Sequence, residues 1–143
     1  MAQAFYATNA VAQAGLNAMV DLIDGGTTPI IRIYDGTPPA NADAALSLND
    51  PLVDLEMDGT AAFGNASDAN PGAIATAATI QDGTAGDTGT ATFFRILTQD
   101  AGTVRFQGTV GTSDADLILS TTSITTGSTV SISSATITLP EGP

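Results

Sequence analysis

The stretch from residue 90 to residue 110 constrains the fold most, because two runs of β-branched and aromatic residues flank a short connection that contains Asp and Gly. This pattern is typical of a β-hairpin with a loop of about 3–5 residues. Both faces of the first run carry apolar side chains, so we expect that strand in the interior of a sheet. One face holds Ala91, Phe93, Arg95 and Leu97, and the other holds Thr92, Phe94 and Ile96.

A helix is predicted over residues 8–24. Thr8 or Asn9 suits its N-cap, and the sequence Asp24-Gly-Gly suits its end, with the glycine pair as a left-handed C-cap. Apolar residues recur at helical spacing and predict a stripe that covers one face of a sheet. The stripe consists of Val11, Gly15, Leu16, Met19, Val20 and Ile23.

Short strands separated by turn signals make up most of the remaining chain. Residues 29–34 predict a strand, residues 40–50 a loop, and Val53, Leu55 and Met57 a strand with one solvated face. A long last strand changes its apolar phase near Ser133 and Ser134, which predicts a β-bulge there. We therefore expect a mainly β fold: an antiparallel β-sandwich or jelly-roll-like domain over residues 8–143, with one N-terminal α-helix.

The composition excludes several classes of function. The 143-residue chain has no His, Cys or Lys, so the commonest general base, thiolate chemistry and Schiff-base chemistry are missing. The net charge is −12, and Arg32, Arg95 and Arg105 are the three basic residues. Such a field repels phosphate backbones and anionic lipids, so we expect neither nucleic acid nor membrane as a partner. The sequence indicates no cofactor and no metal site, since the acidic loop at residues 82–89 lacks the ligand series of an EF-hand.

Two local features leave alternatives open. Residues 1–7 form an N-terminal arm that carries Phe5 and Tyr6, which either pack onto their own domain or reach a neighbouring subunit. These two aromatics are our candidate contact between subunits, whereas no residue qualifies as catalytic. Arg32 lies among apolar strand residues, where it pairs with a carboxylate at the rim of the sheet or contacts a partner.

The order of these motifs resembles a family of small structural proteins of tailed-bacteriophage virions. The resemblance covers nearly the whole chain, starting with the Ala-rich helix. The matching segments are Tyr-Asp-Gly-Thr-Pro-Pro-Ala at 34–40, Gly-Thr-Ala-Thr-Phe-Phe-Arg-Ile at 89–96, Gln-Gly-Thr-Val-Gly-Thr at 107–112, Ala-Asp-Leu-Ile-Leu at 115–119, and Ile-Thr-Thr-Gly-Ser-Thr-Val-Ser-Ile-Ser-Ser-Ala-Thr-Ile-Thr at 124–138.

The resemblance implies a non-enzymatic virion component. By analogy with capsid decoration and cement proteins, it would bind the major capsid protein on the outer capsid surface, stabilise the mature shell and associate with itself, as a homotrimer. The alternative is a structural or receptor- and glycan-binding module of a tail or head fibre. That alternative has less support from the sequence, because glycan sites usually use exposed aromatics and the chain has no Trp. A glycosidase would need a pair of carboxylates, and no Asp or Glu pair is marked by its setting.

Overall fold

The computed structural model describes residues 6–24, 28–57, 61–69, 72–98 and 102–140. Within these ranges one helix, α1 (Asn9–Asp21), precedes twelve strands, many of them only two residues long. The prediction of a mainly β protein with one N-terminal helix is therefore confirmed. The strands are β1 (Ile30–Tyr34), β2 (Pro51–Glu56), β3 (Ser67–Asp68), β4 (Ala73–Thr76), β5 (Gly83–Thr84), β6 (Gly89–Thr90), β7 (Phe93–Leu97), β8 (Val104–Gly111), β9 (Leu117–Ile118), β10 (Ser123–Ile124), β11 (Thr129–Val130) and β12 (Thr136–Leu139).

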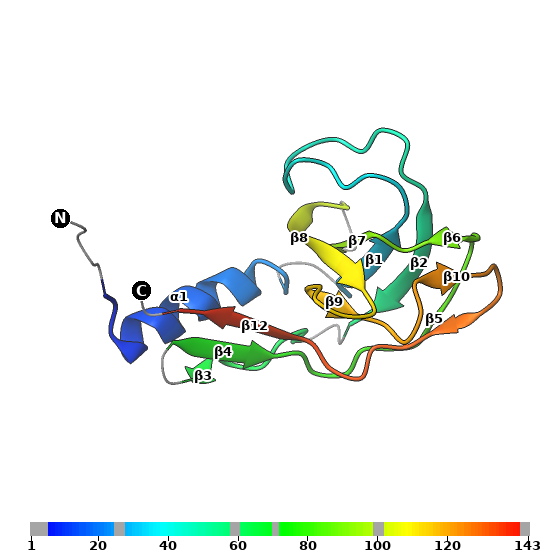
Figure 1. Cartoon of the computed structure of the whole chain (residues 1–143). Coiled ribbons are helices and arrows are strands. Elements are labelled where there is room, and N and C mark those ends of the chain that lie inside the picture. The colour runs from blue at the N-terminus through cyan, green and yellow to red at the C-terminus, as the bar shows by residue number, and fades with distance from the viewer. Residues whose placement is uncertain (1–5, 25–27, 58–60, 70–71, 99–101, 141–143) are drawn as a thin grey trace.

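The largest sheet has five strands in the order β2-β1-β7-β8-β9 (Figure 1). The predicted hairpin is confirmed as the antiparallel pair β7–β8, and β7 lies in the sheet interior between β1 and β8, as expected. The β8–β9 pair is parallel, which departs from the all-antiparallel expectation. Val110 pairs with Leu117 across a connection far shorter than the crossover of a dozen or more residues that parallel strands usually need.

The two faces of this sheet are covered differently. On one face, Tyr34 stacks on Phe93 with ring centroids 4.9 Å apart, and Arg95 and Gln107 donate to carbonyls of the loop at residues 35–50, which lies above the sheet (Figure 1). The opposite face carries Ile31, Ile33 and Ile96 and belongs to the main hydrophobic core. We call these the loop-covered face and the core face.

The second layer combines α1 with the three-stranded sheet β12-β4-β3 (Figure 1). Thr8 is the N-cap, as predicted, and its Oγ1 accepts a hydrogen bond from the Val11 N–H at 3.4 Å. Four apolar side chains of the helical segment are buried: Ala12, Leu16, Val20 and Ile23. Gly15 allows close packing, because a Cβ there would lie 3.2 Å from Leu139 Cδ2.

Two predictions about local structure were wrong. Val11 does not belong to the buried stripe, since its side chain is 61% exposed. The long last strand is in fact two strands in different sheets: β11 pairs with β5 and β12 pairs with β4. The change of phase at Ser133 and Ser134 is thus a break between sheets rather than a bulge within one strand. The loop at residues 40–50 is confirmed. A third prediction also differs from the structure: α1 ends at Asp21 with Leu22 in right-handed conformation as its C-cap, so the glycine pair, which lies outside the described residues, is not that cap.

Candidate interaction site

Of the two predicted contact residues, Phe5 lies outside the described residues and Tyr6 lies just before α1. The Tyr6 side chain is 65% exposed. It therefore does not pack onto its own domain, although a large apolar ring usually finds cover in a folded protein. The contact role of Phe5 and Tyr6 stays a prediction, and the exposed Tyr6 ring is available to a neighbouring subunit.

The outward face of α1 is also apolar. Its exposed residues Val11, Ala14, Ala18 and Leu22 follow one another at intervals of three or four, so they lie in one row along the helical segment. We call this row the outer stripe. Leu22 is 54% exposed, and Asp21 is the one charged residue within α1.

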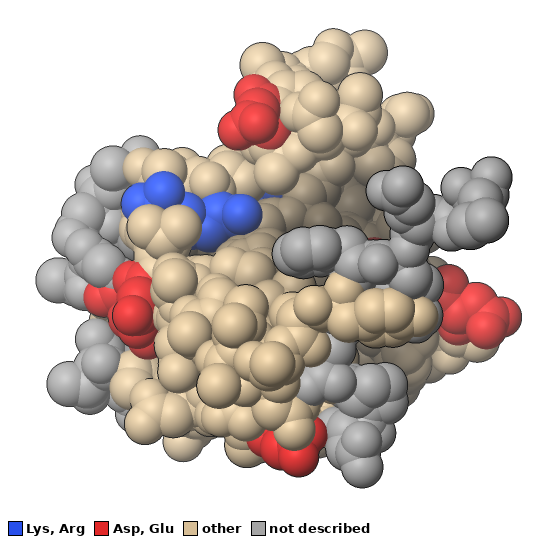
Figure 2. Space-filling view, turned by 90° about the vertical axis from the view of Figure 1, so that its left-hand side faces the viewer, with Lys and Arg blue, Asp and Glu red and all other residues tan. Residues whose placement is uncertain are grey.

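A helix with apolar residues on both its inner and outer faces is normally buried on both. Here the inner face packs on β4 and β12, whereas the outer stripe is open to solvent in the free chain. Figure 2 looks at the end of the molecule where α1 begins. Uncharged side chains make up most of this view, and the acidic groups lie apart from one another. On a chain of net charge −12, such a surface suits contact with another protein.

A groove with both apolar and polar lining, about 640 Å³ in volume, is a second candidate surface; its polar lining includes Gln107, Ser133, Ser134, Thr136 and Thr138. It lies between the core face of the large sheet and the segment that leads into β12. Its main apolar lining consists of Ile31, Phe94, Ile96, Phe106, Ile118 and Ile137. Phe94 and Phe106 are only partly buried and Ile118 is 52% exposed, so the core face is not fully covered along β8 and β9.

Glycine in β8 gives the groove its shape. A Cβ at Gly108 would lie 2.6 Å from Phe94 Cε1, closer than real Cβ atoms approach. The absence of that side chain lets the Phe94 ring lie over β8 and form part of the groove wall. Any larger residue at position 108 would push the ring out of this position.

Asp116 is the one acid among the groove residues, and it is held by its own chain. The Thr109 backbone N–H and the Thr109 hydroxyl each donate to Asp116 Oδ2 at 2.9 Å. These hydrogen bonds, the backbone one first, lower the pKa of the Asp116 carboxyl. A carboxylate stabilised in its charged form is a poor general acid, and here it fixes the connection between β8 and β9.

Two arginines of the sheet, Arg32 and Arg95, have structural contacts. Arg32 donates from Nε and Nη2 to the two carboxylate oxygens of Asp54 at 2.6 and 2.8 Å, so the predicted pair at the sheet rim is confirmed. This contact raises the pKa of the Arg32 guanidinium. Arg95 is 4% exposed, and its guanidinium donates to Gln107 Oε1 at 2.9 Å and to the Ala44 carbonyl at 2.7 Å.

Sequence reasoning placed Arg95 on a face with Phe93 and Leu97 but did not identify its role. The register shows a polar row across the loop-covered face, in which Asp54, Arg32, Arg95 and Gln107 are successive cross-strand partners. In the sequence, the only indication of this row was that the two strands of the predicted hairpin carry an arginine, Arg95, and a glutamine, Gln107, that can face each other. The carbonyl acceptors lie in a loop more than fifty residues earlier, and no local pattern predicts that contact.

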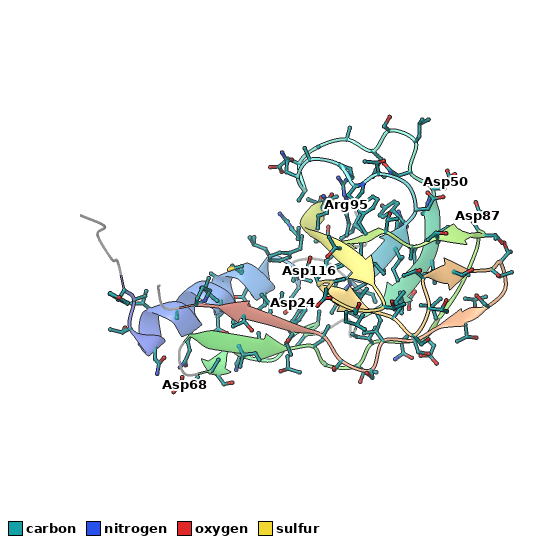
Figure 3. The ribbon with its side chains drawn as sticks, in the orientation of Figure 1. Asp24, Asp50, Asp68, Asp87, Arg95 and Asp116 are labelled. Atoms are coloured by element: carbon teal, nitrogen blue, oxygen red, sulfur yellow. The ribbon has the colours of Figure 1, made fainter. Side chains whose placement is uncertain are left out.

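No catalytic arrangement emerges from the described side chains. Figure 3 shows labelled acids on separate elements, with Asp68 at one end of the molecule and Asp87 at the other. In the ranges that the structure describes, no three His, Cys, Asp or Glu residues gather in a group that could hold a metal ion. Within the same ranges, no helix is long and apolar enough to cross a membrane.

Comparison with known proteins identifies no relative. No protein-family model matches the chain, no curated protein matches it, and no solved structure matches it. A proposal about function therefore has to be argued from the uncharged surfaces and from the resemblance of the sequence motifs.

Proposed function

We propose that the protein is a non-enzymatic structural component of a tailed-bacteriophage virion. In this proposal it binds the outer face of the mature capsid shell and stabilises it, as decoration and cement proteins do. Its partners are the major capsid protein and further copies of itself, as a homotrimer. The resemblance of the sequence motifs suggests the particle, and the outer stripe of α1 suggests a role in protein–protein contact.

The outer stripe is the observation that carries the proposal. Val11 and Leu22, at the two ends of the stripe, are each more than half exposed, and so is Tyr6 in the arm before the helix. Full burial of a Val or Leu side chain contributes about 1.5–3 kcal/mol, so a protein surface that covers this stripe gains several kcal/mol from it. A chain that acted alone would gain nothing from leaving these residues in water.

The charge of the chain is compatible with this location. A net charge of −12 opposes binding to the packaged genome, whose phosphates carry the same sign. It also makes contacts between copies depend on uncharged patches, because charged ones repel. The outer stripe and the arm before it are such patches.

Stabilisation follows from binding that occurs only in the assembled shell. A ligand that binds one state stabilises it by RT ln(1 + [L]/Kd), which is about 2.7 kcal/mol per site at 100 times Kd. Many equivalent sites on a shell act together. Shells that lack the protein should therefore release their genomes at a lower temperature than complete shells, and added protein should restore the original temperature.

The decisive variant is Val11→Asp, which places a carboxylate in the outer stripe. An acid in the first turn suits the helix dipole, so the variant should remain folded. Leu48→Asp, at a side chain that is 92% exposed, is the matched control with the same added charge. We expect V11D to lose re-binding to depleted shells and L48D to retain it. Equal release temperatures for depleted and complete particles would contradict the proposal.

A further inference from the structure

We infer that the groove receives the N-terminal arm of a second copy of this chain, with Phe5 as the main anchor in the apolar part around Phe94, Phe106 and Ile118. This inference names the contact through which the proposed self-association occurs, and so it rests on that part of the proposed function. It makes a claim about free protein in solution, which can be tested without any shell.

The groove exists because the core face of the large sheet extends beyond its own cover. Ile31 and Ile96 at the groove floor are 2% and 5% exposed, but the aromatic rings of Phe94 and Phe106 are only partly covered. Ile118 stands at the rim with half of its surface in water. A volume of about 640 Å³ lies within the range of about 300–1,000 Å³ that is usual for binding pockets.

The arm of the same chain is too short to fill the aromatic part of this groove. α1 has thirteen residues and is therefore about 20 Å long. The arm joins α1 at its N-terminal end, whereas β8 and β9 lie beyond its C-terminal end (Figure 1). Phe5 is three residues before the Thr8 N-cap, so extended backbone carries it at most about 11 Å from that residue. Another copy has no such restriction.

The chemistry of the arm matches the groove. Residues 1–7 read Met-Ala-Gln-Ala-Phe-Tyr-Ala and carry no charged side chain, which is the requirement for contact between two chains of net charge −12. The groove contributes one acid, Asp116, whose carboxylate already accepts two hydrogen bonds from Thr109. An acidic segment would be repelled there, whereas an apolar arm with an aromatic ring buries the exposed surfaces of both partners.

Two edge strands border the groove and favour an extended occupant. Among the described strands, β9 ends the five-stranded sheet and β12 ends the three-stranded sheet. Edge strands offer unpaired backbone groups to an added extended segment, while the pockets between alternate side chains receive its large residues. Three copies that each receive one arm from a neighbour close into a ring, in keeping with the proposed homotrimer.

The test compares three proteins by light scattering. One lacks residues 2–6, one carries Ile118→Asp at the groove rim, and one carries Leu48→Asp as the control for added charge. We expect wild-type protein and L48D to be oligomeric, and we expect the other two proteins to have the mass of a single chain. Their self-association should be weaker by at least about 100-fold, because the deletion removes the aromatic anchor and I118D places an unpaired charge at the contact.

A mixing experiment separates this contact from every other mode of association. The arm-deleted protein keeps an intact groove, and I118D keeps an intact arm. Mixed together, they should form a one-to-one complex that neither forms alone. If I118D fails to fold, a fluorescent peptide of residues 1–8 replaces it, and the peptide should bind the arm-deleted protein.

Three results would overturn the inference: a wild-type protein that remains a single chain, an arm-deleted protein with the wild-type mass, or a mixture without complex formation. If the groove binds the capsid shell rather than a second copy, wild type and I118D should both be monomeric. In that case I118D, but not wild type, should fail to bind the shell. Failure of shell binding with normal arm exchange would contradict the proposed function and leave the inference intact.

Discussion

The two faces of the five-stranded sheet differ in what covers them. The loop-covered face is closed by its own chain: Arg95 and Gln107 donate to the carbonyls of Ala44 and Pro39 at 2.7 and 2.9 Å, and the Tyr34–Phe93 stack on the same face is buried. The core face is closed over β1 and β2 but open along β8 and β9, where the groove lies.

This difference shows two ways in which a face of a sheet can be covered. A long loop can cover one face if polar side chains hold it by its backbone carbonyls, because loops contain many such acceptors. An apolar face offers no such donors and needs apolar cover. The described chain covers part of the core face, and we propose that a second copy covers the rest.

The largest expected effect on the free energy of unfolding comes from replacing one phenylalanine on each face of the sheet by alanine. Phe93 is fully buried on the loop-covered face, and its replacement by Ala should lower the free energy of unfolding by about 3–5 kcal/mol. Phe106, on the neighbouring strand and the other face, is only partly buried. F106A should cost less than half as much when urea unfolding is measured at a concentration where the protein is monomeric. Equal costs would mean that the groove face is closed in the free chain.

The second prediction tests the polar closure of the loop-covered face. Arg95→Ala leaves the Gln107 side chain and the Ala44 carbonyl without their donor in a partly buried setting and removes a buried side chain, so we expect a loss of about 2 kcal/mol in urea unfolding. Arg105→Ala, at an exposed position on the adjacent strand, is the control for removal of one positive charge and should stay within about 0.5 kcal/mol. If the two variants lose the same amount, the loop is held by something other than Arg95.

The smallest effect concerns the acid at the groove. The Thr109 hydrogen bonds lower the pKa of Asp116 from its ordinary value of 3.8, so the folded state favours the carboxylate. Its contribution to stability is complete above that ordinary pKa and is lost as the pH falls through the lower folded pKa. Asp116→Asn should therefore be less stable than wild type at pH 7, by less than about 1 kcal/mol because the group is mostly solvated.

Urea midpoints at pH 7, 4 and 2 test this sign. The difference between wild type and D116N should shrink as the pH falls below about 4. Asp43→Asn, at an exposed loop position, controls for the loss of one negative charge from an acidic protein. A difference that grows on acidification would contradict the assignment of Asp116 as an acceptor for Thr109.

Local patterns predicted the elements that depend on neighbouring residues. The β7–β8 hairpin, the β1 strand and the Thr8 cap follow from side-chain alternation, turn residues and capping chemistry, and all three are present. The ion pair of Arg32 was also foreseen, because a charge in an apolar strand requires a partner. The contact role of Phe5 and Tyr6 stays a prediction.

The misjudged features depend on contacts that are distant in sequence. Periodicity in α1 shows two apolar stripes but does not say which one meets β4 and β12, and so Val11 was assigned to the wrong stripe. The break between β11 and β12 depends on their partners β5 and β4, which lie about 45 and about 60 residues earlier in the chain. The groove exists because the core face of the large sheet is not fully covered along β8 and β9. A sequence pattern does not show which part of a sheet face the rest of the chain covers.

The packing of α1 against β12 has a consequence during synthesis. About 115 residues separate the end of the helix from the start of this strand. At ribosomal rates of about 5–20 residues per second, β12 is synthesised on the order of ten seconds after α1. During that interval both of its apolar stripes are available to other nascent chains or to chaperones. Expression at lower temperature or with added chaperone should therefore raise the soluble yield more for this chain than for a variant with a polar outer stripe.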